Sequence, residues 1–174
     1  VAIDTMAVLY EAGLLKAALV IAPKGVYDNW VKGEIPIHLP KRIPRTICRW
    51  TPSKTKRFEE ELMAFIVDKE PSLKIFVMNV EAFSSARGPT AATAFLYQNP
   101  ENMVVVDEST TIKNRKAART KAIMALQKHS KYRRILTGSP ITKSPMDLFS
   151  QCGFLAEKSL GFNSYYAFQA RYAN

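Results

Sequence analysis

Short runs of consecutive apolar residues alternate along this chain with longer segments in which apolar residues recur every three or four positions. The short runs are typical of parallel strands that are buried on both faces, and the periodic segments are typical of amphipathic helices. Strands are predicted at 17–22, 45–49, 74–79, 103–106 and 133–137, and helices at 1–12, 27–31, 51–68, 91–97, 115–129, 148–155 and 165–172. This alternation indicates an α/β fold, a three-layer sandwich around a mostly parallel sheet.

Glycine and proline set several of the predicted boundaries. Gly13 is expected to end the first helix in a left-handed conformation. Pro36, Pro40 and Pro44 are expected to interrupt regular structure before the second strand, because proline has no backbone N–H to donate. The segment Thr51-Pro52-Ser53 resembles the start of a helix. The apolar positions expected on one face of the basic 115–129 helix are Ala118, Ala122, Ile123 and Leu126.

The composition fits one domain with its own core. The chain has 174 residues, 47% of them hydrophobic, and no repeat or composition shift marks a second domain. Lys and Arg outnumber Asp and Glu by 25 to 15, and the net charge of +10 favours a polyanionic partner such as nucleic acid. No apolar run approaches the roughly 20 residues that cross a bilayer. We therefore expect no membrane partner and an intracellular location, in a prokaryotic or virus-infected cytoplasm or in a eukaryotic nucleus.

The cysteines and histidines carry no metal-binding pattern. Cys48 and Cys152 are far apart, without Cys or His at ligand spacing, so both are predicted to be ordinary core thiols in a reducing compartment. His38 and His129 lie in mixed basic or apolar stretches without a partner acid nearby, which predicts a surface or packing role.

Two adjacent carboxylates, Asp107 and Glu108, directly follow the apolar run 103–106. Open α/β sheets bind their ligands at the carboxyl ends of the strands. Acids at that position are a familiar arrangement for phosphoryl transfer. Asp107 would then hold Mg²⁺ through water, and Glu108 would orient or deprotonate an attacking water. The alternative is a pair of solvated acids at the end of a strand.

A second polar segment, Thr137-Gly138-Ser139-Pro140, follows the last predicted strand. Gly and Pro make it compatible with a simple turn. If the two strands are neighbours, the hydroxyls of Thr137 and Ser139 lie where they can hydrogen-bond the acids and respond to the terminal phosphate of a nucleotide.

The order of these segments resembles the first RecA-like lobe of helicase superfamily two, and within it the Swi/Snf-type DNA translocases. The segment 18–24 followed by Asn29-Trp30 is similar to motif Ia, and 77–81 is similar to motif Ib. The segment 104–108 followed by Ile112-Lys113-Asn114 resembles motif II, and 136–140 resembles motif III. Residues 147–149 and 154–155 follow the family's pattern beyond motif III.

The resemblance implies a P-loop NTPase fold that uses ATP and Mg²⁺ and acts on nucleic acid, namely double-stranded DNA. Asp107 and Glu108 would serve hydrolysis, while Thr137 and Ser139 would contact the nucleotide and couple hydrolysis to DNA. The residues that would lie near the nucleic acid are Pro23, Lys24, Asn79, Lys113 and Asn114. Trp30 is predicted to pack in the core and not to stack on a base.

The chain departs from the family at two points. Ser109-Thr110 stands where the family commonly has Ala-His, so the contact of that histidine is missing or replaced by hydroxyls. In addition, none of the seven glycines precedes a lysine, as a phosphate-binding loop requires. In the family this loop precedes the helix in which Val1 falls, so we expect the loop upstream and residues 1–174 to be one incomplete lobe. A second RecA-like lobe would supply the arginine finger.

The sequence thus predicts a lobe of a nucleic-acid-dependent ATPase of the helicase or translocase type, inactive when isolated. One alternative is a non-catalytic basic module that binds nucleic acid or protein and retains the motor fold. A metal-dependent nuclease would need further acids and a lysine around the metal, and the sequence offers no matching set in a neighbouring strand.

Overall fold

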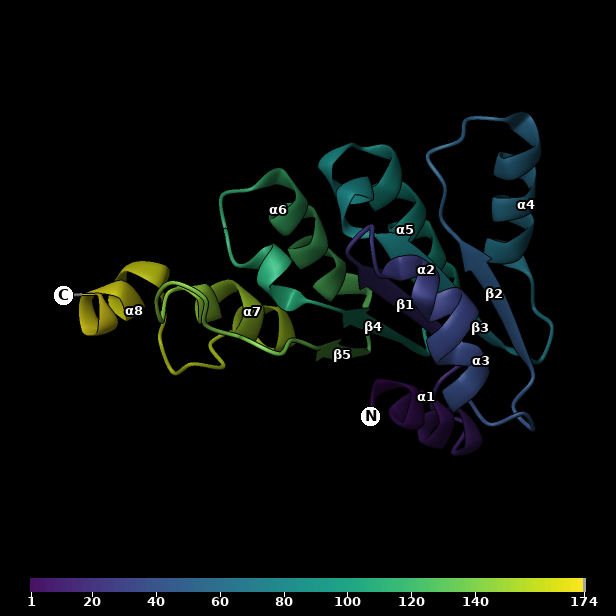
Figure 1. The fold of residues 1–174 in the computed structure, drawn as a ribbon, viewed down its shortest axis with the longest axis horizontal. Coiled ribbons are helices and arrows are strands. Elements are labelled where there is room, and N and C mark those ends of the chain that lie inside the picture. The colour runs from purple at the N-terminus through teal and green to yellow at the C-terminus, as the bar shows by residue number, and fades with distance from the viewer. Residues whose placement is uncertain (174) are drawn as a thin grey trace.

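Five parallel strands form one sheet in the computed structural model, which describes residues 1–173. The strands follow the spatial order β2-β3-β1-β4-β5 (Figure 1). Their bounds are β1 Ala17–Ala22, β2 Arg45–Arg49, β3 Leu73–Asn79, β4 Asn102–Val106 and β5 Tyr132–Ile135. Each pairing is parallel, which confirms the predicted sheet.

The helices are α1 Ala2–Glu11, α2 Tyr27–Asn29, α3 Ile35–His38, α4 Lys56–Val67, α5 Arg87–Gln98, α6 Ala118–Ala125, α7 Asp147–Leu155 and α8 Tyr165–Tyr172. A π-helical turn at Trp30–Glu34 joins α2 to α3, and 3₁₀ turns cover Val80–Ser84, Ser109–Ile112 and Leu126–His129. Among the described residues, no helix combines the length and the apolar character needed to span a membrane.

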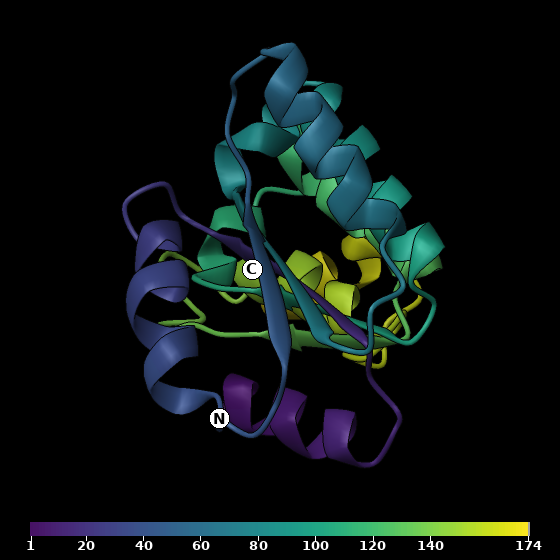
Figure 2. The same cartoon turned by 90° about the vertical axis from the view of Figure 1, so that its right-hand side faces the viewer.

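Alternate residues of β1 belong to two different cores, one on each face of the sheet. Leu19 and Ile21 pack in the core that α4, α5, α6 and α7 cover. Ala18 and Val20 pack in the core that α1 and the segment 30–39 cover. Figure 2 shows α1 on one side of the sheet and α4 and α5 on the other. Because both faces are covered, every residue of β1 is buried, which explains its unbroken apolar run.

The predicted helix at 27–31 is too short. The helical segment continues to His38 and includes Pro36. The backbone N–H of Ile35 donates to the carbonyl of Trp30, five residues earlier. The helical hydrogen-bond pattern therefore changes from four-residue to five-residue spacing immediately before Pro36. The missing N–H of Pro36 therefore falls in the first turn of α3, where proline is tolerated.

Three predicted helix starts are wrong. α4 begins at Lys56 and not at 51, because the Thr55 hydroxyl accepts a bond from the Phe58 N–H and caps the helix there. α5 begins at Arg87, four residues before the predicted 91, with Pro89 in its first turn. α6 begins at Ala118, which is exposed and does not share the buried face of Ile123.

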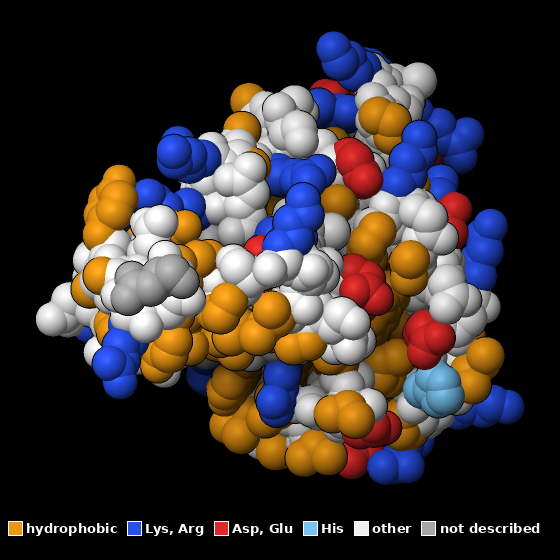
Figure 3. All heavy atoms as spheres, turned by 60° about the vertical axis from the view of Figure 1, so that its left-hand side comes forward, with side chains coloured by type: hydrophobic (Ala, Val, Ile, Leu, Met, Phe, Trp, Pro, Cys, Tyr) orange, Lys and Arg blue, Asp and Glu red, His pale blue; other side chains and the backbone are white. Residues whose placement is uncertain are grey.

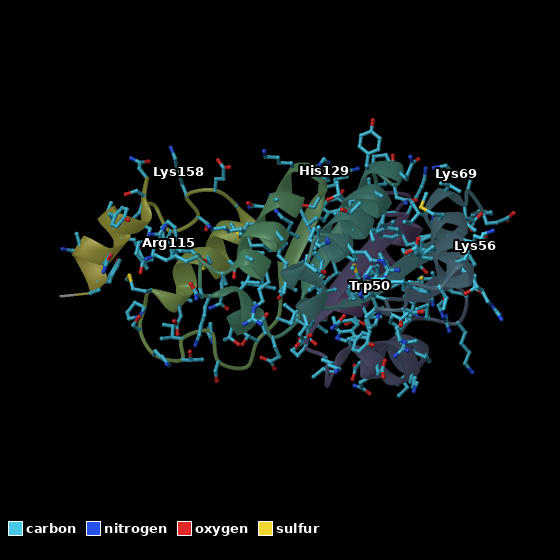
Figure 4. The ribbon with its side chains drawn as sticks, turned by 90° about the horizontal axis from the view of Figure 1, so that it is seen from above. Trp50, Lys56, Lys69, Arg115, His129 and Lys158 are labelled. Atoms are coloured by element: carbon cyan, nitrogen blue, oxygen red, sulfur yellow. The ribbon has the colours of Figure 1, made fainter. Side chains whose placement is uncertain are left out.

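The last helix, α8, was predicted with the correct bounds. Its Tyr165 ring stacks against the guanidinium of Arg115, with 4.1 Å between the guanidinium carbon and the ring centroid. Figure 4 labels Arg115 beside α8. Phe149 of α7 also contacts Tyr165, with ring centroids 5.3 Å apart. Aromatic and cation–π contacts therefore attach α8 to α7 and to the loop before α6.

The strand register brings the polar segments to one edge of the sheet. Ala22 of β1 lies opposite Asn79 of β3, and Val106 of β4 lies opposite Ile135 of β5. The residues that follow these strands therefore share the carboxyl edge of the sheet, where α/β proteins bind ligands.

Candidate functional site

Asp107 is the first residue after β4, and two hydrogen bonds orient its side chain. Oδ2 accepts a bond from the indole Nε1 of Trp30 at 2.8 Å, and Oδ1 accepts one from the backbone N–H of Glu108 at 2.9 Å. Trp30 is only 5% exposed and belongs to the core against α1. Its predicted packing role is confirmed, and its bond to Asp107 was not predicted from the sequence.

Glu108 lies in the left-handed region, with φ 47° and ψ 60°, and its side chain is exposed. Its Oε2 accepts a hydrogen bond from the Thr137 hydroxyl at 3.4 Å. The expected meeting of the acids with the turn after β5 is therefore present for Thr137. No such bond is present for Ser139, because within residues 1–173 its hydroxyl bonds neither acid, and its expected contact with the nucleotide stays a prediction. Only its backbone N–H takes part, donating to Thr137 Oγ1 at 3.2 Å.

A cavity of about 350 Å³ lies beside Asp107. Its lining comes from the first residues of α1, the segment from α2 to α3, and the residues that follow β4 and β5. The lining residues are Val1, Ala2, Ile3, Asp4, Val26, Asn29, Trp30, Glu34, His38, Asp107 and Leu136. On the face drawn in Figure 3, acidic side chains and a histidine lie close together.

His38 does have an acidic partner, which corrects the sequence prediction. Its Nε2 lies 3.6 Å from Glu34 Oε2, one helical turn earlier. The predicted surface position is confirmed, since the His38 side chain is 57% exposed. The partner was missed because the helix was expected to end before His38.

Pro23, Lys24 and Asn79 lie side by side at the carboxyl edge. Pro23 follows Ala22, whose register partner is Asn79. The Asn79 amide donates to Glu81 Oε2 at 3.1 Å, and Lys24 is exposed. Three of the five residues expected near nucleic acid therefore share one short stretch of the sheet edge, and their role stays a prediction.

Lys113 and Asn114, the other two, make contacts within the protein. The Lys113 ammonium donates to the Thr142 hydroxyl and lies 3.8 Å from Asp147 Oδ2. Asn114 Oδ1 accepts a bond from the Lys116 N–H at 3.0 Å and closes a turn. Lys113 thus connects the loop after the acids to the start of α7, and its role toward nucleic acid stays a prediction.

Both cysteines are free and half-buried, in keeping with the predicted core thiols. Burial, with the charge of Glu61 as a smaller cause, raises the pKa of Cys48 to about 11. Burial also raises the pKa of Cys152. Both thiols are therefore protonated at neutral pH and are poor nucleophiles.

The oxygen donors that follow β4 and β5 suit a magnesium ion held through water. Asp107, Glu108 and Thr137 offer only oxygen atoms, which Mg²⁺ prefers, and Mg²⁺ commonly keeps several waters. Across residues 1–173, no three His, Cys, Asp or Glu side chains converge on one point as a metal cage would require. The residues present therefore fit an ion that shares its coordination with water and phosphate.

Comparisons with known proteins agree with the fold. The model of the SNF2-related domain matches residues 3–173. The chain is 28% identical over 156 residues to the Xenopus tropicalis SWI/SNF-related matrix-associated actin-dependent regulator of chromatin subfamily A-like protein 1, covering 90% of this chain and 14% of that protein. It is 31% identical over 118 residues to the putative helicase 172L of Invertebrate iridescent virus 6, covering 66% of this chain and 19% of that protein.

A solved structure, the Sulfolobus solfataricus SWI2/SNF2 ATPase core in complex with dsDNA, superposes with a TM-score of 0.66 at 24% identity. The match covers 97% of this chain and 31% of that one. The chain thus spans a small part of the relatives that it matches. Its domain match and its parallel sheet establish that the chain belongs to the SNF2-related domain family and has the fold of a first RecA-like lobe.

Proposed function

We propose that this chain is the lobe that carries the hydrolytic acids of an ATP-dependent motor that moves along double-stranded DNA. The observation that carries the proposal is the position of Asp107, Glu108 and Thr137 at one sheet edge, with Asp107 lining a cavity that the amino end of α1 also lines. A terminal phosphate in this cavity would lie near acids suited to a metal and a water.

Each of the three side chains has a distinct role in this proposal. Asp107, oriented by Trp30, holds Mg²⁺ through water, and the ion when bound neutralises phosphate charge. Glu108 is exposed toward solvent and orients or deprotonates the attacking water. Thr137 donates to Glu108 and keeps its carboxylate close to β5, so that a change at the phosphate reaches both strands.

Double-stranded DNA is the proposed track. The net charge of +10 favours a polyanion, and Pro23, Lys24 and Asn79 lie together on the same sheet edge as the acids. The Sulfolobus protein with this fold is described in complex with dsDNA, which supports the choice of track. Hydrolysis and DNA contact would then take place on neighbouring strands of one sheet.

The lobe is proposed to work together with a phosphate-binding loop and with a second RecA-like lobe. None of its seven glycines precedes a lysine, so residues 1–174 hold no phosphate-binding loop. We therefore expect the 174-residue chain alone to hydrolyse ATP negligibly. Brisk hydrolysis by this chain that is stimulated by DNA and abolished by Glu108→Gln would contradict that expectation.

The test of the proposed function is Glu108→Gln in the intact motor. We expect DNA-stimulated turnover to fall at least about a hundredfold, because the general base is lost, while binding of Mg-ATP persists. The matched control is Glu157→Gln, which neutralises an exposed acid beyond α7. Wild-type turnover in the Glu108 variant would refute the assignment.

The alternative, a non-catalytic basic module, makes a different prediction for the same assay. It predicts that the intact protein binds DNA and shows no DNA-stimulated hydrolysis in any variant. The positive charge is the observation that favours it.

A further inference from the structure

A buried amide connects the segment after the two acids to α7. Ser109 and Gln151 are both fully buried. The Ser109 hydroxyl donates to Gln151 Oε1 at 2.6 Å. Nε2 of Gln151 donates to the carbonyl oxygens of Pro140, at 2.7 Å, and of Asp147, at 2.8 Å. The oxygen and both protons of one side-chain amide are thus used to join three segments of the chain.

The first of these segments determines the conformation of Glu108. A residue other than glycine persists in the left-handed region only where its surroundings hold it there. Ser109 follows Glu108 directly, and its backbone N–H donates to the Leu136 carbonyl at 2.9 Å while its hydroxyl bonds Gln151. The peptide that leaves Glu108 is therefore held from β5 on one side and from α7 on the other.

The second segment is the turn that carries Thr137. Gln151 holds the Pro140 carbonyl at the end of this turn, and the Thr137 hydroxyl at its start donates to Glu108. Gln151 consequently restrains both the acid and the hydroxyl that contacts it.

We propose that Gln151 is a positioning residue that sets Glu108 against Thr137 through its hydrogen bonds to Ser109 and Pro140. This inference rests on the proposed ATP hydrolysis and names a further residue that controls it. Gln151 is fully buried, so it acts through the backbone and not on the nucleotide. Small displacements of a catalytic group lower the rate strongly while binding contacts remain.

The kinetic test is Gln151→Met in the intact motor, which keeps the length of the side chain and removes its hydrogen bonds. We expect kcat for DNA-stimulated hydrolysis to fall at least about tenfold and the Kd for Mg-ADP to change less than about twofold. A merely structural role would instead lower stability and leave kcat per folded molecule unchanged.

Gln127→Met is the matched control. Gln127 Nε2 donates to the carbonyls of Gly153, at 2.7 Å, and Phe154, at 3.0 Å, and so holds the other end of α7 away from the acids. We expect this variant to lose thermal stability and to keep kcat. Equal losses of kcat in both glutamine variants, or wild-type kcat in Gln151→Met, would overturn the inference.

A second measurement does not depend on activity. In the 174-residue chain, we expect Gln151→Met and Ser109→Ala each to speed amide hydrogen exchange at residues 109 and 111 at least about tenfold. Gln127→Met should leave this exchange unchanged. Unchanged exchange in both single variants would refute the inference.

The double variant of Ser109 and Gln151 gives a further kinetic test. It should lose no more kcat than the worse single variant, because both partners of the bond are then absent.

The two proposals fail in different ways. If the wild-type motor does not hydrolyse ATP, the proposed function and this inference both fall. If the wild type hydrolyses ATP and Gln151→Met does so equally well, only the inference falls.

Discussion

Trp30 Nε1 donates to Asp107 Oδ2 at 2.8 Å, so a core side chain from the segment after β1 orients the acid at the end of β4. The indole is 5% exposed and packs in the core between α1 and the sheet. Because packing holds the Trp30 ring in place, its bond also holds the Asp107 carboxylate in one orientation at the cavity.

Trp30→Phe is expected to damage both stability and activity. The variant keeps an aromatic ring and removes the donor to Asp107, so we expect the free energy of unfolding to fall by about 1–3 kcal/mol. We expect kcat/KM for Mg-ATP in the intact motor to fall at least about tenfold, because the carboxylate is no longer oriented. Urea unfolding and steady-state hydrolysis measure the two effects.

Trp50→Phe separates the two effects. Trp50 is 3% exposed in the other core and is labelled in Figure 4, and it makes T-shaped contacts with Phe58 and Phe76. This variant should lose stability and retain kcat/KM. A similar drop of kcat/KM in both tryptophan variants would argue against a specific role for the bond between Trp30 and Asp107.

Asp147→Asn is expected to destabilise the start of α7. Oδ2 of Asp147 accepts bonds from the Thr142 hydroxyl at 2.7 Å and from the Thr142 and Lys143 N–H groups at 2.9 Å each. Burial raises the pKa of Asp147, but these bonds and the charge of Lys113 outweigh it and lower the pKa from 3.8 to about 2. Loss of the carboxylate should cost about 1.5–3 kcal/mol at neutral pH.

The lowered pKa of Asp147 also gives a pH dependence. Its stabilising contribution is present above the unfolded pKa of 3.8 and is lost as the pH falls from there through about 2. Urea midpoints measured across this range should fall less steeply for Asp147→Asn than for the wild type. Asp68→Asn is the control, because Asp68 accepts a single backbone bond, from Glu70 at 3.0 Å. Identical slopes for the wild type and the Asp147 variant would contradict this prediction.

DNA binding should depend steeply on salt, with a contribution from Lys24. Lys24 is exposed at the carboxyl edge, and we expect Lys24→Ala to reduce the slope of log K against log salt by about 0.9, the value for one phosphate contact. Fluorescence anisotropy with a labelled duplex measures the slope. Lys128→Ala, in the 3₁₀ turn that precedes β5 at the opposite edge, should leave it unchanged. Equal effects of both variants would indicate that binding depends on net charge alone.

Cys48 should react slowly with alkylating agents. Its pKa is raised from 9.0 to about 11, mainly by burial, so its thiolate fraction at pH 8 is about a hundredfold below that of an ordinary thiol. We expect iodoacetamide to label Cys48 far faster in the urea-unfolded chain than in the folded one, as followed by mass spectrometry. Rapid labelling of the folded chain at pH 8 would show that the thiol is not buried as described.

The accuracy of the predicted boundaries depended on how local their causes are. β1, β2 and α8 were predicted with correct bounds. An unbroken apolar run marks β1, and Pro44 marks the start of β2. The helix through Pro36 was missed because a π-helical turn, which has no simple sequence pattern, moves the proline to a tolerated position. The start of α4 was misplaced because Thr51, Ser53 and Thr55 are all suitable caps, and only the path of the chain selects Thr55.

The sequence by itself determined the fold class, the family resemblance and the placement of Asp107, Glu108 and Thr137 at the carboxyl edge. These conclusions follow from neighbouring residues, since a buried parallel strand has a recognisable composition and the residue after it has one possible location. For Ser139 the sequence suggested a hydroxyl bond to the acids, whereas in the structure its backbone N–H bonds Thr137 Oγ1.

Only the tertiary structure decided which side chains hold the site in place. Trp30 and Asp107 are 77 residues apart in sequence, and Ser109 and Gln151 are 42 apart. Glutamine, serine and tryptophan occur in many environments, and no local pattern indicates a partner on another element. Such bonds depend on the packing of whole helices against the sheet, which orients each side chain only after distant segments have come together.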